Sequence, residues 1–321
     1  MPQPKVAVIL AVLNEVDFID ACLESLTAQD YTGPFEIVVA DGGSDDGTLD
    51  WLKEWADRGV TTIHNPDRVQ SYGLNAAADA TDAEILVRAD GHTAYQLDYL
   101  SRSVEALEGS GAIAAGGLMT PQGDSRFTRA VAAAMTSPLA IGPGKFHHST
   151  EAGPVDTVYL GAFRRTDFLN AGGFRALPSG VAEDADLYFR WRQQGETVWL
   201  DPSIRSTYRP RRGFGALWRQ YFRWGRGKAD MFHANGKFPS WRPLAPLALI
   251  LGLDVSVVLA IYGFWWPLAV IGGAWLAVLI LAALSTFNAL VAPITAVMHS
   301  AYGVGMAVGL VRRRSTNPKR D

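Results

Sequence analysis

The chain has 321 residues, of which 48% are hydrophobic and 19% charged, and its formal net charge is −3. This composition excludes low-complexity disorder, because the apolar content is high and the net charge is small. Cys22 is the single cysteine of the sequence, which excludes a disulfide scaffold and favours a reducing compartment for the folded part. The length suits one large domain or two ordinary ones.

The charge is divided unevenly along the chain. Residues 1–204 hold 14 Lys and Arg against 29 Asp and Glu, whereas residues 205–321 hold 15 against 3. An acidic half followed by a basic, apolar half predicts a soluble head on a membrane-facing base. A nucleic-acid binder would carry basic residues without long apolar runs, so we expect no nucleic-acid partner.

The acidic half alternates between strand-like and helix-like segments. The sequence predicts strands at Lys5–Val12, Phe35–Ala40, Val60–His64, Glu84–Ala89 and Ala112–Leu118. Between them it predicts helices at Asp17–Gln29, Asp46–Asp57, Ser71–Ala80 and Gln96–Leu107. This alternation predicts parallel βαβ units with helices on both faces of a sheet, whose ligands bind at the carboxyl ends of the strands.

Polar side chains follow three of these strands: Asn14 and Glu15, then Asp41, then Asp90 with His92. Asp41-Gly-Gly-Ser44 is also compatible with a plain strand-to-helix turn in which Ser44 caps the helix. Asp90-Gly91-His92 fits a turn and a metal site about equally well, since both side chains can face a cation such as Mn²⁺ or Mg²⁺. No GxGxxG follows the first strand, which argues against a dinucleotide site.

A second acidic cluster comes later. Val155–Leu160 reads as a strand, and Glu183-Asp184 opens a helix that runs to about Gln193. Carboxylates at this position stabilise a helix N-terminus whatever else they do. Because the preceding segment is loop-like, one of them can also reach into a cleft as a base.

The segment Ser137–Pro154 reads as a loop. It is either a lid that closes over a substrate or a solvated connection, and the two readings have about equal support. His148 within it is a weaker candidate metal ligand than His92.

Residues 205–242 carry 10 Lys and Arg and one acid, Asp230, with aromatic residues interleaved. This pattern predicts a basic amphipathic helix at a membrane surface, whose arginines can also bind phosphate.

Three apolar stretches follow, at about Pro246–Tyr262, Phe264–Leu284 and Phe287–Leu310. The second is long enough to span a bilayer and carries no charge. The first is short and contains Asp254, and the third is diluted by Asn288, His299 and glycines. A buried helical subdomain is the alternative, although such runs offer no polar face to water.

Basic residues flank both ends of this apolar region, and positive flanks prefer the cytoplasmic side. Two cytoplasmic ends require an even number of crossings, whereas the sequence offers three candidates. Either one stretch is re-entrant or interfacial, or the C-terminal basic residues do not decide the side on which the chain ends. No cleavable signal peptide is expected after the short apolar run Val6–Leu13.

Taken in order, the motifs resemble those of family 2 glycosyltransferases of the GT-A fold, over about residues 5–230. The matching segments are Val12–Glu15, Asp41–Gly47, Asn75, Asp90–His92, Gly161–Arg165, Glu183-Asp184 and Gln220-x-x-Arg223-Trp224. The later part resembles more narrowly the succinoglycan-type β-1,3-glucosyltransferases. That likeness rests on Val155–Arg165, Gln220–Gly227 and His299-x-x-Tyr302-Gly303.

The resemblance implies an inverting transfer of a sugar, glucose or a related hexose, from a UDP-sugar to a lipid-linked saccharide in exopolysaccharide or cell-surface glycan assembly. It implies Asp184 as the catalytic base, and Asp90 with His92 as ligands of Mn²⁺ or Mg²⁺. His92 departs from the family's usual second Asp. The implied nucleotide-sugar site comprises Asn14, Glu15, Asp41, Arg68, Asn75 and Asp90. The implied acceptor and diphosphate site comprises Glu183, Gln220, Arg223 and Trp224.

The expected organisation is an α/β GT-A catalytic domain at residues 1–210 and a basic membrane-interface segment at 211–242. Two or three transmembrane helices at 243–311 and a basic tail at 312–321 complete it. We expect a multi-pass protein of the cytoplasmic membrane whose catalytic domain faces the cytoplasm. The alternatives are a polyprenyl-phosphate glycosyltransferase, a processive polysaccharide synthase, a nucleotidyltransferase and a non-catalytic membrane partner of a synthase complex.

Overall fold

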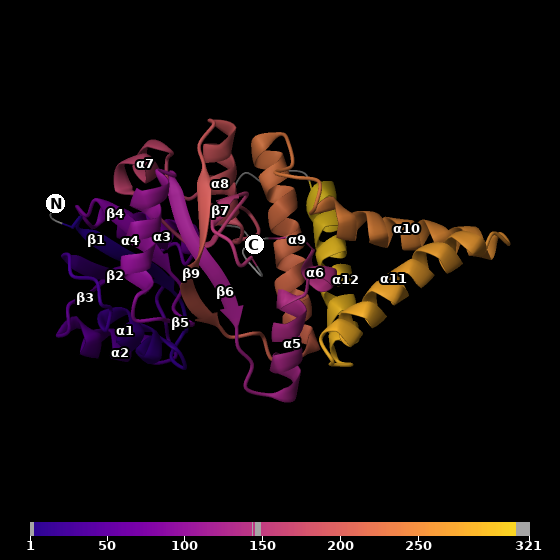
Figure 1. Ribbon diagram of the computed structural model, residues 1–321, viewed down its shortest axis with the longest axis horizontal. Helices are drawn as coiled ribbons and strands as arrows, with labels where there is room; N and C mark the ends of the chain where they lie inside the picture. Colours follow the sequence, from indigo (N-terminus) through magenta and orange to yellow (C-terminus); the bar gives the residue numbers. More distant parts are fainter. Residues whose placement is uncertain (1–2, 143, 145–148, 313–321) are drawn as a thin grey trace.

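The computed structural model describes residues 3–142, 144 and 149–312. His148, the weaker candidate ligand, lies outside the described residues. The first two thirds of the chain fold around a nine-stranded sheet of order β3-β2-β1-β4-β8-β6-β9-β5, with β7 paired to β9 off this path (Figure 1). The strands are β1 (Val6–Val12), β2 (Phe35–Asp41), β3 (Val60–His64), β4 (Ile85–Ala89), β5 (Thr93–Tyr95), β6 (Ala114–Pro121), β7 (Gly153–Val155), β8 (Tyr159–Arg164) and β9 (Val198–Tyr208).

Helices cover both faces of this sheet, as predicted. They are α1 (Ile19–Thr27), α2 (Thr48–Ala56), α3 (Gln70–Asp79), α4 (Tyr99–Ser110), α5 (Arg126–Thr136), α6 (Pro138–Ile141), α7 (Arg165–Asn170) and α8 (Glu183–Gln193). Strand β1 shows why both faces are covered. Val8 and Leu10 pack with α1, α2 and α4, whereas Ala7 and Ile9 pack with α3 and α8. Successive side chains point to opposite faces, so a strand that is apolar throughout is buried on both sides.

The sheet is mixed, and this corrects the expected strand at Val155–Leu160. That segment is divided between β7, which ends at Val155, and β8, which begins at Tyr159. Strand β8 is antiparallel to both β4 and β6. The residues Gly161–Arg164 therefore lie within a strand and do not follow one.

Strands β5 and β9 were not predicted. In β9 the buried Ile204 and Ser206 alternate with the exposed Ser203 and Arg205. Asp201 and Pro202 interrupt this strand with residues of low strand propensity, and pairing with β6 holds it in the sheet.

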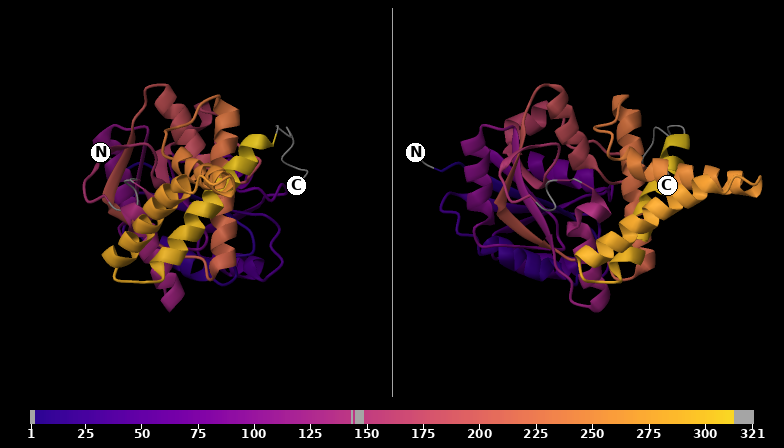
Figure 2. Two further views of the ribbon diagram at one scale, coloured as in Figure 1. Left: turned by 90° about the vertical axis from the view of Figure 1, so that its right-hand side faces the viewer. Right: turned by 45° about the vertical axis from the view of Figure 1, so that its right-hand side comes forward.

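Four long helices complete the chain: α9 (Phe214–Asn235), α10 (Leu244–Ile261), α11 (Trp266–Ser285) and α12 (Val291–Val311). Helix α9 lies between the sheet domain and α12, and the α10–α11 pair projects away from the rest of the molecule (Figures 1 and 2). Helices α10, α11 and α12 are long and apolar enough to cross a membrane, with mean hydropathies of 2.4, 2.4 and 1.5.

Candidate active site

Three of the predicted polar clusters meet at one edge of the sheet. Strand β1 is parallel to β2 and to β4, and in this register Val12 lies opposite Asp41 and Leu10 opposite Ala89. The residues after these strands are therefore neighbours. Glu15 Oε1 lies 3.2 Å from His92 Nδ1, which joins the loop after β1 to the loop after β4.

Asp41 organises the loop that follows β2. Its Oδ1 accepts hydrogen bonds from the backbone N–H groups of Gly43 and Ser44 at 2.8 and 3.0 Å, and its Oδ2 accepts one from Ser44 Oγ at 2.6 Å. Ser44 Oγ in turn accepts a hydrogen bond from the backbone N–H of Asn14 at 2.9 Å. Ser44 does not cap a helix, because α2 begins after Gly47.

Asp90 is buried, and its two oxygens differ in their surroundings. Oδ1 lies 3.3 Å from both Gln70 Nε2 and Arg88 Nη2, while no described residue forms a hydrogen bond with Oδ2. The backbone N–H of Asp90 donates to the Tyr95 hydroxyl at 2.7 Å. A Cβ at Gly91 would lie 2.8 Å from Val12 Cγ1, so glycine lets the loop pass close to β1.

His92 is held between Glu15 and the ring of Tyr208, whose centroid lies 6.1 Å away. Burial disfavours the charged imidazole, but the hydrogen bond to Glu15 and the charge of Asp90 outweigh it and raise the pKa of His92. Its Nε2 has no hydrogen-bond partner among the described residues.

Asp90 and His92 supply only some of the ligands that a divalent cation needs. Among the described residues, no group of three or more His, Cys, Asp or Glu side chains is arranged to hold a metal by itself. Asp90 Oδ2 and His92 Nε2 remain open among the described residues; the carboxylate oxygen suits Mn²⁺ and Mg²⁺ alike, and the imidazole nitrogen favours Mn²⁺ of the two. The remaining ligands would have to come from a bound substrate.

Arg88 connects the strand-end loops to α8, and the sequence analysis missed it. Its side chain is 5% exposed; Nη2 lies 2.9 Å from Glu183 Oε1, and Nη1 lies 3.7 Å from Asp184 Oδ2. Burial opposes the charged guanidinium, but the carboxylates of Asp90, Glu183 and Asp184 raise the pKa of Arg88 above its usual value. The available signal was one charge inside the apolar strand Ile85–Ala89, two residues before Asp90.

The two carboxylates at the start of α8 have different environments. Glu183 is almost fully buried against Arg88. Burial raises the pKa of Glu183; the charge of Arg88 opposes this rise, and the charge of Asp184 adds to it. The Asp184 side chain is 27% exposed, and its Oδ1 accepts a hydrogen bond from the Ala185 backbone N–H at 2.6 Å. Asp184 is therefore the carboxylate that a substrate can reach, whereas Glu183 faces the protein interior.

Helix α9 brings further predicted residues to the site. Gln220 Nε2 donates to the Tyr208 hydroxyl at 2.6 Å, while Gln220 Oε1 is buried and has no hydrogen-bond partner in the described part of the chain. Arg223 is exposed beside Gly180, in the loop before α8. Trp224 instead packs against Tyr221, with ring centroids 4.7 Å apart, in an apolar cluster shared with α12.

Lys228, also on α9, is a second residue that the sequence analysis did not assign to the site. Burial lowers its pKa, although the carboxylates of Asp184, Asp186 and Glu183 oppose that effect. The ammonium group therefore belongs to the same electrostatic environment as the carboxylates of α8.

The two remaining predicted residues lie at the border of the site. Asn75 pairs with the backbone of Phe174 in both directions, at 2.8 and 2.9 Å, and so links α3 to the segment before α8. Arg68 is exposed and has a left-handed backbone, with φ of 57°. Its Cα packs beside Gly42, next to the Asp41 loop.

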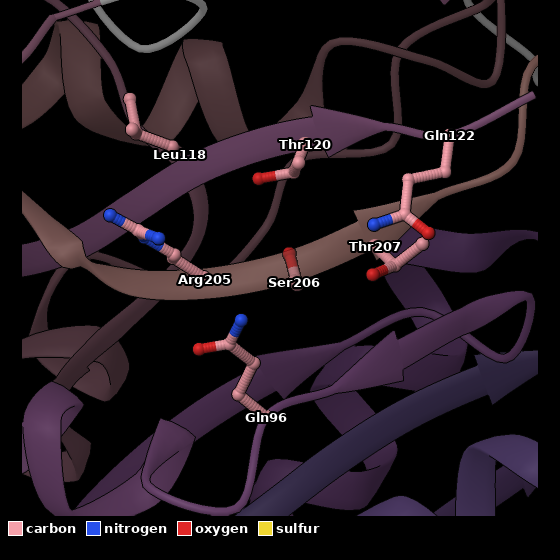
Figure 3. A pocket seen from close by; sticks show the side chains of 7 residues that line it. All are labelled: Gln96, Leu118, Thr120, Gln122, Arg205, Ser206 and Thr207. Carbon is pink, nitrogen blue, oxygen red and sulfur yellow. The ribbon is translucent and has the colours of Figure 1, made fainter.

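A cavity of about 290 Å³ lies elsewhere, on β6 and β9 (Figure 3). Its lining is polar but has no carboxylate, histidine or lysine: Gln96, Leu118, Thr120, Gln122, Arg205, Ser206 and Thr207. None of these is a predicted site residue. We assign the chemistry to the cluster around Arg88, because that cluster combines open carboxylate and imidazole groups at the carboxyl ends of the strands.

Comparison with known proteins agrees with this fold. Residues 7–169 match the model of glycosyl transferase family 2, and residues 158–311 match that of glycosyl transferase family 21. The chain is 31% identical to the succinoglycan biosynthesis protein ExoA of Rhizobium meliloti, over 93% of this chain and 92% of that protein. The chain therefore belongs to glycosyltransferase family 2.

Two further comparisons extend the likeness. A glycosyltransferase of Methanococcus voltae, named for a dolichyl N-acetylglucosaminyl phosphate, is 22% identical over 79% of this chain and 82% of its own length. The mannosyltransferase PcManGT of Pyrobaculum calidifontis, solved with GDP-Man and Mn²⁺, superposes with a TM-score of 0.64. It is 21% identical, with coverage of 96% of this chain and 87% of that one.

The S. aureus protein TarS (residues 1–349), solved with UDP-GlcNAc, gives a TM-score of 0.54 at 14% identity, covering 94% of this chain and 90% of that one. These two structures establish the GT-A type of fold, a mixed α/β sheet followed by C-terminal helices. The protein is a sugar-transferring enzyme of family 2.

Proposed function

We propose that this enzyme transfers a hexose from a UDP-sugar to a lipid-linked saccharide during exopolysaccharide or cell-surface glycan assembly, with inversion at the anomeric carbon. The observation that carries the proposal is the arrangement around Arg88. It gathers Asp90, Glu183 and Asp184 at the carboxyl edge of the sheet, beside the exposed Arg223 of α9.

In this reaction Asp184 takes the proton of the acceptor hydroxyl. The acceptor oxygen forms a bond to the anomeric carbon as the bond from that carbon to the diphosphate breaks, and the nucleoside diphosphate leaves with the electron pair. Asp184 suits this role because it is the accessible carboxylate of the α8 pair and lies near the positive charge of Arg88. Glu183 suits a supporting role, because its carboxylate is buried against Arg88.

The leaving diphosphate gains negative charge, which needs stabilisation. A divalent cation held by Asp90 and His92 would supply it as a Lewis acid. Arg223 and Lys228 of α9 would add positive charge at the same place, and Asn14, Glu15, Asp41 and Arg68 would contact the nucleoside. PcManGT, solved with Mn²⁺, supports a divalent cation, and TarS, solved with UDP-GlcNAc, supports a UDP-sugar.

The acceptor assignment follows from the long apolar helices and from two relatives. An acceptor with a lipid tail would lie in the membrane beside the basic helix α9, which brings its saccharide to Asp184. ExoA is named for succinoglycan biosynthesis, and the Methanococcus voltae enzyme for a dolichyl-linked sugar phosphate. The basic flanks of the apolar region favour a cytoplasmic membrane protein whose catalytic domain faces the cytoplasm.

Heat stability of the full chain in detergent tests the donor class. UDP, GDP, UDP-glucose and GDP-mannose would each be added with and without Mn²⁺. A ligand at 100 times its Kd stabilises the folded state by about 2.7 kcal/mol. We expect the melting temperature to rise with UDP species in the presence of Mn²⁺. A rise with guanine nucleotides alone would overturn the UDP assignment, and no rise with any nucleotide would overturn the proposed donor site.

A further inference from the structure

Helix α12 follows α9 along most of its length. A Cβ at Gly305 would lie 2.1 Å from the Phe222 oxygen, one at Gly225 would lie 2.9 Å from the Met306 nitrogen, and one at Gly309 would lie 2.6 Å from the Ala229 Cβ. The contact points advance together along both helices, so α9 and α12 run parallel. The absence of side chains at these glycines lets the two backbones touch, which fixes the direction of α12 to that of α9.

Helix α9 belongs to the catalytic half of the protein. Gln220 bonds to Tyr208 of β9, and Asp230 Oδ2 accepts a hydrogen bond from the Ser179 backbone N–H at 2.8 Å. The helix also carries Arg219, Arg223, Arg226 and Lys228. If α12 stood upright in a bilayer, the parallel α9 and these charges would enter the hydrocarbon with it, where ionised side chains are costly.

Helix α12 has further neighbours in the catalytic half. His299 Nε2 lies 2.7 Å from the Ala140 carbonyl oxygen of α6, and Val291, Ile294 and Met298 are buried in a cluster with α5 and α9. In its most apolar window, 44% of α12 is buried inside the protein. One side of α12 thus packs against the catalytic domain, so its two sides have different surroundings.

Helices α10 and α11 are far less covered by protein, although α11 touches α6 and adds Ala282 to the same buried cluster. Only 6% and 11% of their apolar windows are buried, and their mean hydropathy is 2.4. Helix α10 contacts α12 near its start, where Pro246 and Ile250 flank Gly303, and then runs away from it. The two helices form a hairpin that projects from the α9–α12 layer (Figures 1 and 2).

The length and the tip of this hairpin fit a bilayer. With 18 residues, α10 is about 27 Å long, close to the roughly 30 Å hydrocarbon core. The turn at its end is aromatic and uncharged: Tyr262 is 76% exposed, Trp265 69% and Trp266 62%. Tyr and Trp are enriched where a helix emerges at the membrane–water interface.

We infer that, within the described residues, α10 and α11 are the membrane crossings, while α12 lies flat at the interface alongside α9. Two crossings place the start of α10 and both ends of α12 on the same side as the catalytic domain. This topology accounts for the basic residues at both ends of the apolar region, which three crossings would separate across the membrane. The partner surface is the lipid bilayer itself.

Cysteine labelling in the full chain tests this inference. Native Cys22 is buried, and the wild type serves as the unlabelled control. The variants are Phe264→Cys at the hairpin tip, Phe287→Cys before α12 and Arg312→Cys after it. Glu105→Cys, at an exposed position of α4, reports the side of the catalytic domain. A membrane-impermeant maleimide would be applied to spheroplasts and, separately, to inverted vesicles.

We expect Phe287→Cys, Arg312→Cys and Glu105→Cys to be labelled from one side, and Phe264→Cys from the other. Labelling of Phe287→Cys and Arg312→Cys from opposite sides would show that α12 crosses, and would overturn the inference. Labelling of Phe264→Cys from the catalytic side would show a re-entrant hairpin, and would overturn it equally. If Arg312→Cys fails to accumulate, a fluorescent protein fused to the wild-type C-terminus reports the side on which α12 ends; fluorescence is expected, and its absence would show that α12 crosses. None of these readouts requires sugar transfer, so they fail or succeed independently of the proposed function.

Discussion

At the scale of single residues, the site depends on one buried cation. Arg88 has Asp90, Glu183 and Asp184 around it, so three carboxylates share one guanidinium. Its Nε and Nη1 atoms are buried without hydrogen-bond partners among the described residues. A buried charge group of this kind is poor evidence for stability by itself, yet removing one partner leaves the others uncompensated. The buried charges of this cluster therefore lower the stability of the protein, and they hold Asp184 in position.

We predict that Arg88→Met destabilises the protein by about 3–5 kcal/mol, because it leaves buried carboxylates without a counter-charge. Thermal unfolding in detergent measures this loss. Arg88→Lys should recover part of it, and adding Glu183→Gln to Arg88→Met should recover another part. Arg102→Met is the matched control, since Arg102 pairs with Asp98 and Glu105 at the surface. Equal melting temperatures for Arg88→Met and Arg102→Met would refute the role given to Arg88.

We predict that His92→Ala raises the Mn²⁺ concentration needed for half-maximal activity by roughly tenfold or more, because it removes one of the two proposed protein donors. His92→Asp should restore most of the affinity, since it supplies a carboxylate at the same position. Activity measured against Mn²⁺ concentration gives the answer. An unchanged metal requirement in His92→Ala would remove His92 from the metal site.

At the scale of elements, α9 holds the loop before α8, the helix that carries the proposed base Asp184. Asp230 accepts a hydrogen bond from the Ser179 N–H, and Asn235 Nδ2 donates to Asp186 Oδ1 at 2.7 Å. Between them, Met231 is fully buried with Leu177 and Phe189. One face of α9 thus holds α8 and the loop before it, while the other face holds α12.

We predict that Asp230→Ala lowers kcat by roughly tenfold and leaves the donor KM within about twofold, because loss of a charged acceptor frees the loop before Asp184. Asp230→Asn should retain most activity, since its amide oxygen can accept the same hydrogen bond. Asp201→Ala, which removes only a local bond to the Ser203 N–H, is the control. If Asp230→Ala and Asp201→Ala have the same kcat, α9 does not position the base.

Sequence patterns predicted the elements whose signal is local. The apolar strand Lys5–Val12 and the polar residues after three strands were sufficient to bring Glu15, Asp41 and Asp90 to one edge. Arg88, Asp230 and strand β9 could not be predicted in the same way. The Asp230–Ser179 bond spans 51 positions, and the partners of Arg88 come from α8, so their roles exist only in the packed fold.

At the scale of the whole molecule, the C-terminal helices α9 and α12 are part of the catalytic domain's core. One buried cluster contains Met135 of α5, Tyr208 of β9, Leu217 of α9 and Ile294 and Met298 of α12. Each such buried side chain contributes roughly 1.5–3 kcal/mol, which is a large share of a typical stability of about 5–15 kcal/mol. The catalytic half is therefore not expected to fold independently of α12.

We predict that a chain ending at residue 240 aggregates or melts at least 10 °C below the full chain. The reason is that it loses buried contacts on the order of several kcal/mol. Trp265→Ser, at the exposed hairpin tip, should leave the melting temperature unchanged. Both are measured in the same detergent. A truncated chain that stays soluble with the full-chain melting temperature would show that α12 is only an anchor.

We propose that Asp184 deprotonates a lipid-linked acceptor in this family 2 glycosyltransferase. The transfer of label from a radioactive UDP-hexose into the lipid fraction, compared between Asp184→Asn and the wild type, tests this role. General-base catalysis contributes roughly 10²–10⁴-fold, so we predict at least a hundredfold loss in the variant, with UDP binding unchanged. Wild-type rates of labelling in Asp184→Asn would show that Asp184 is not the base.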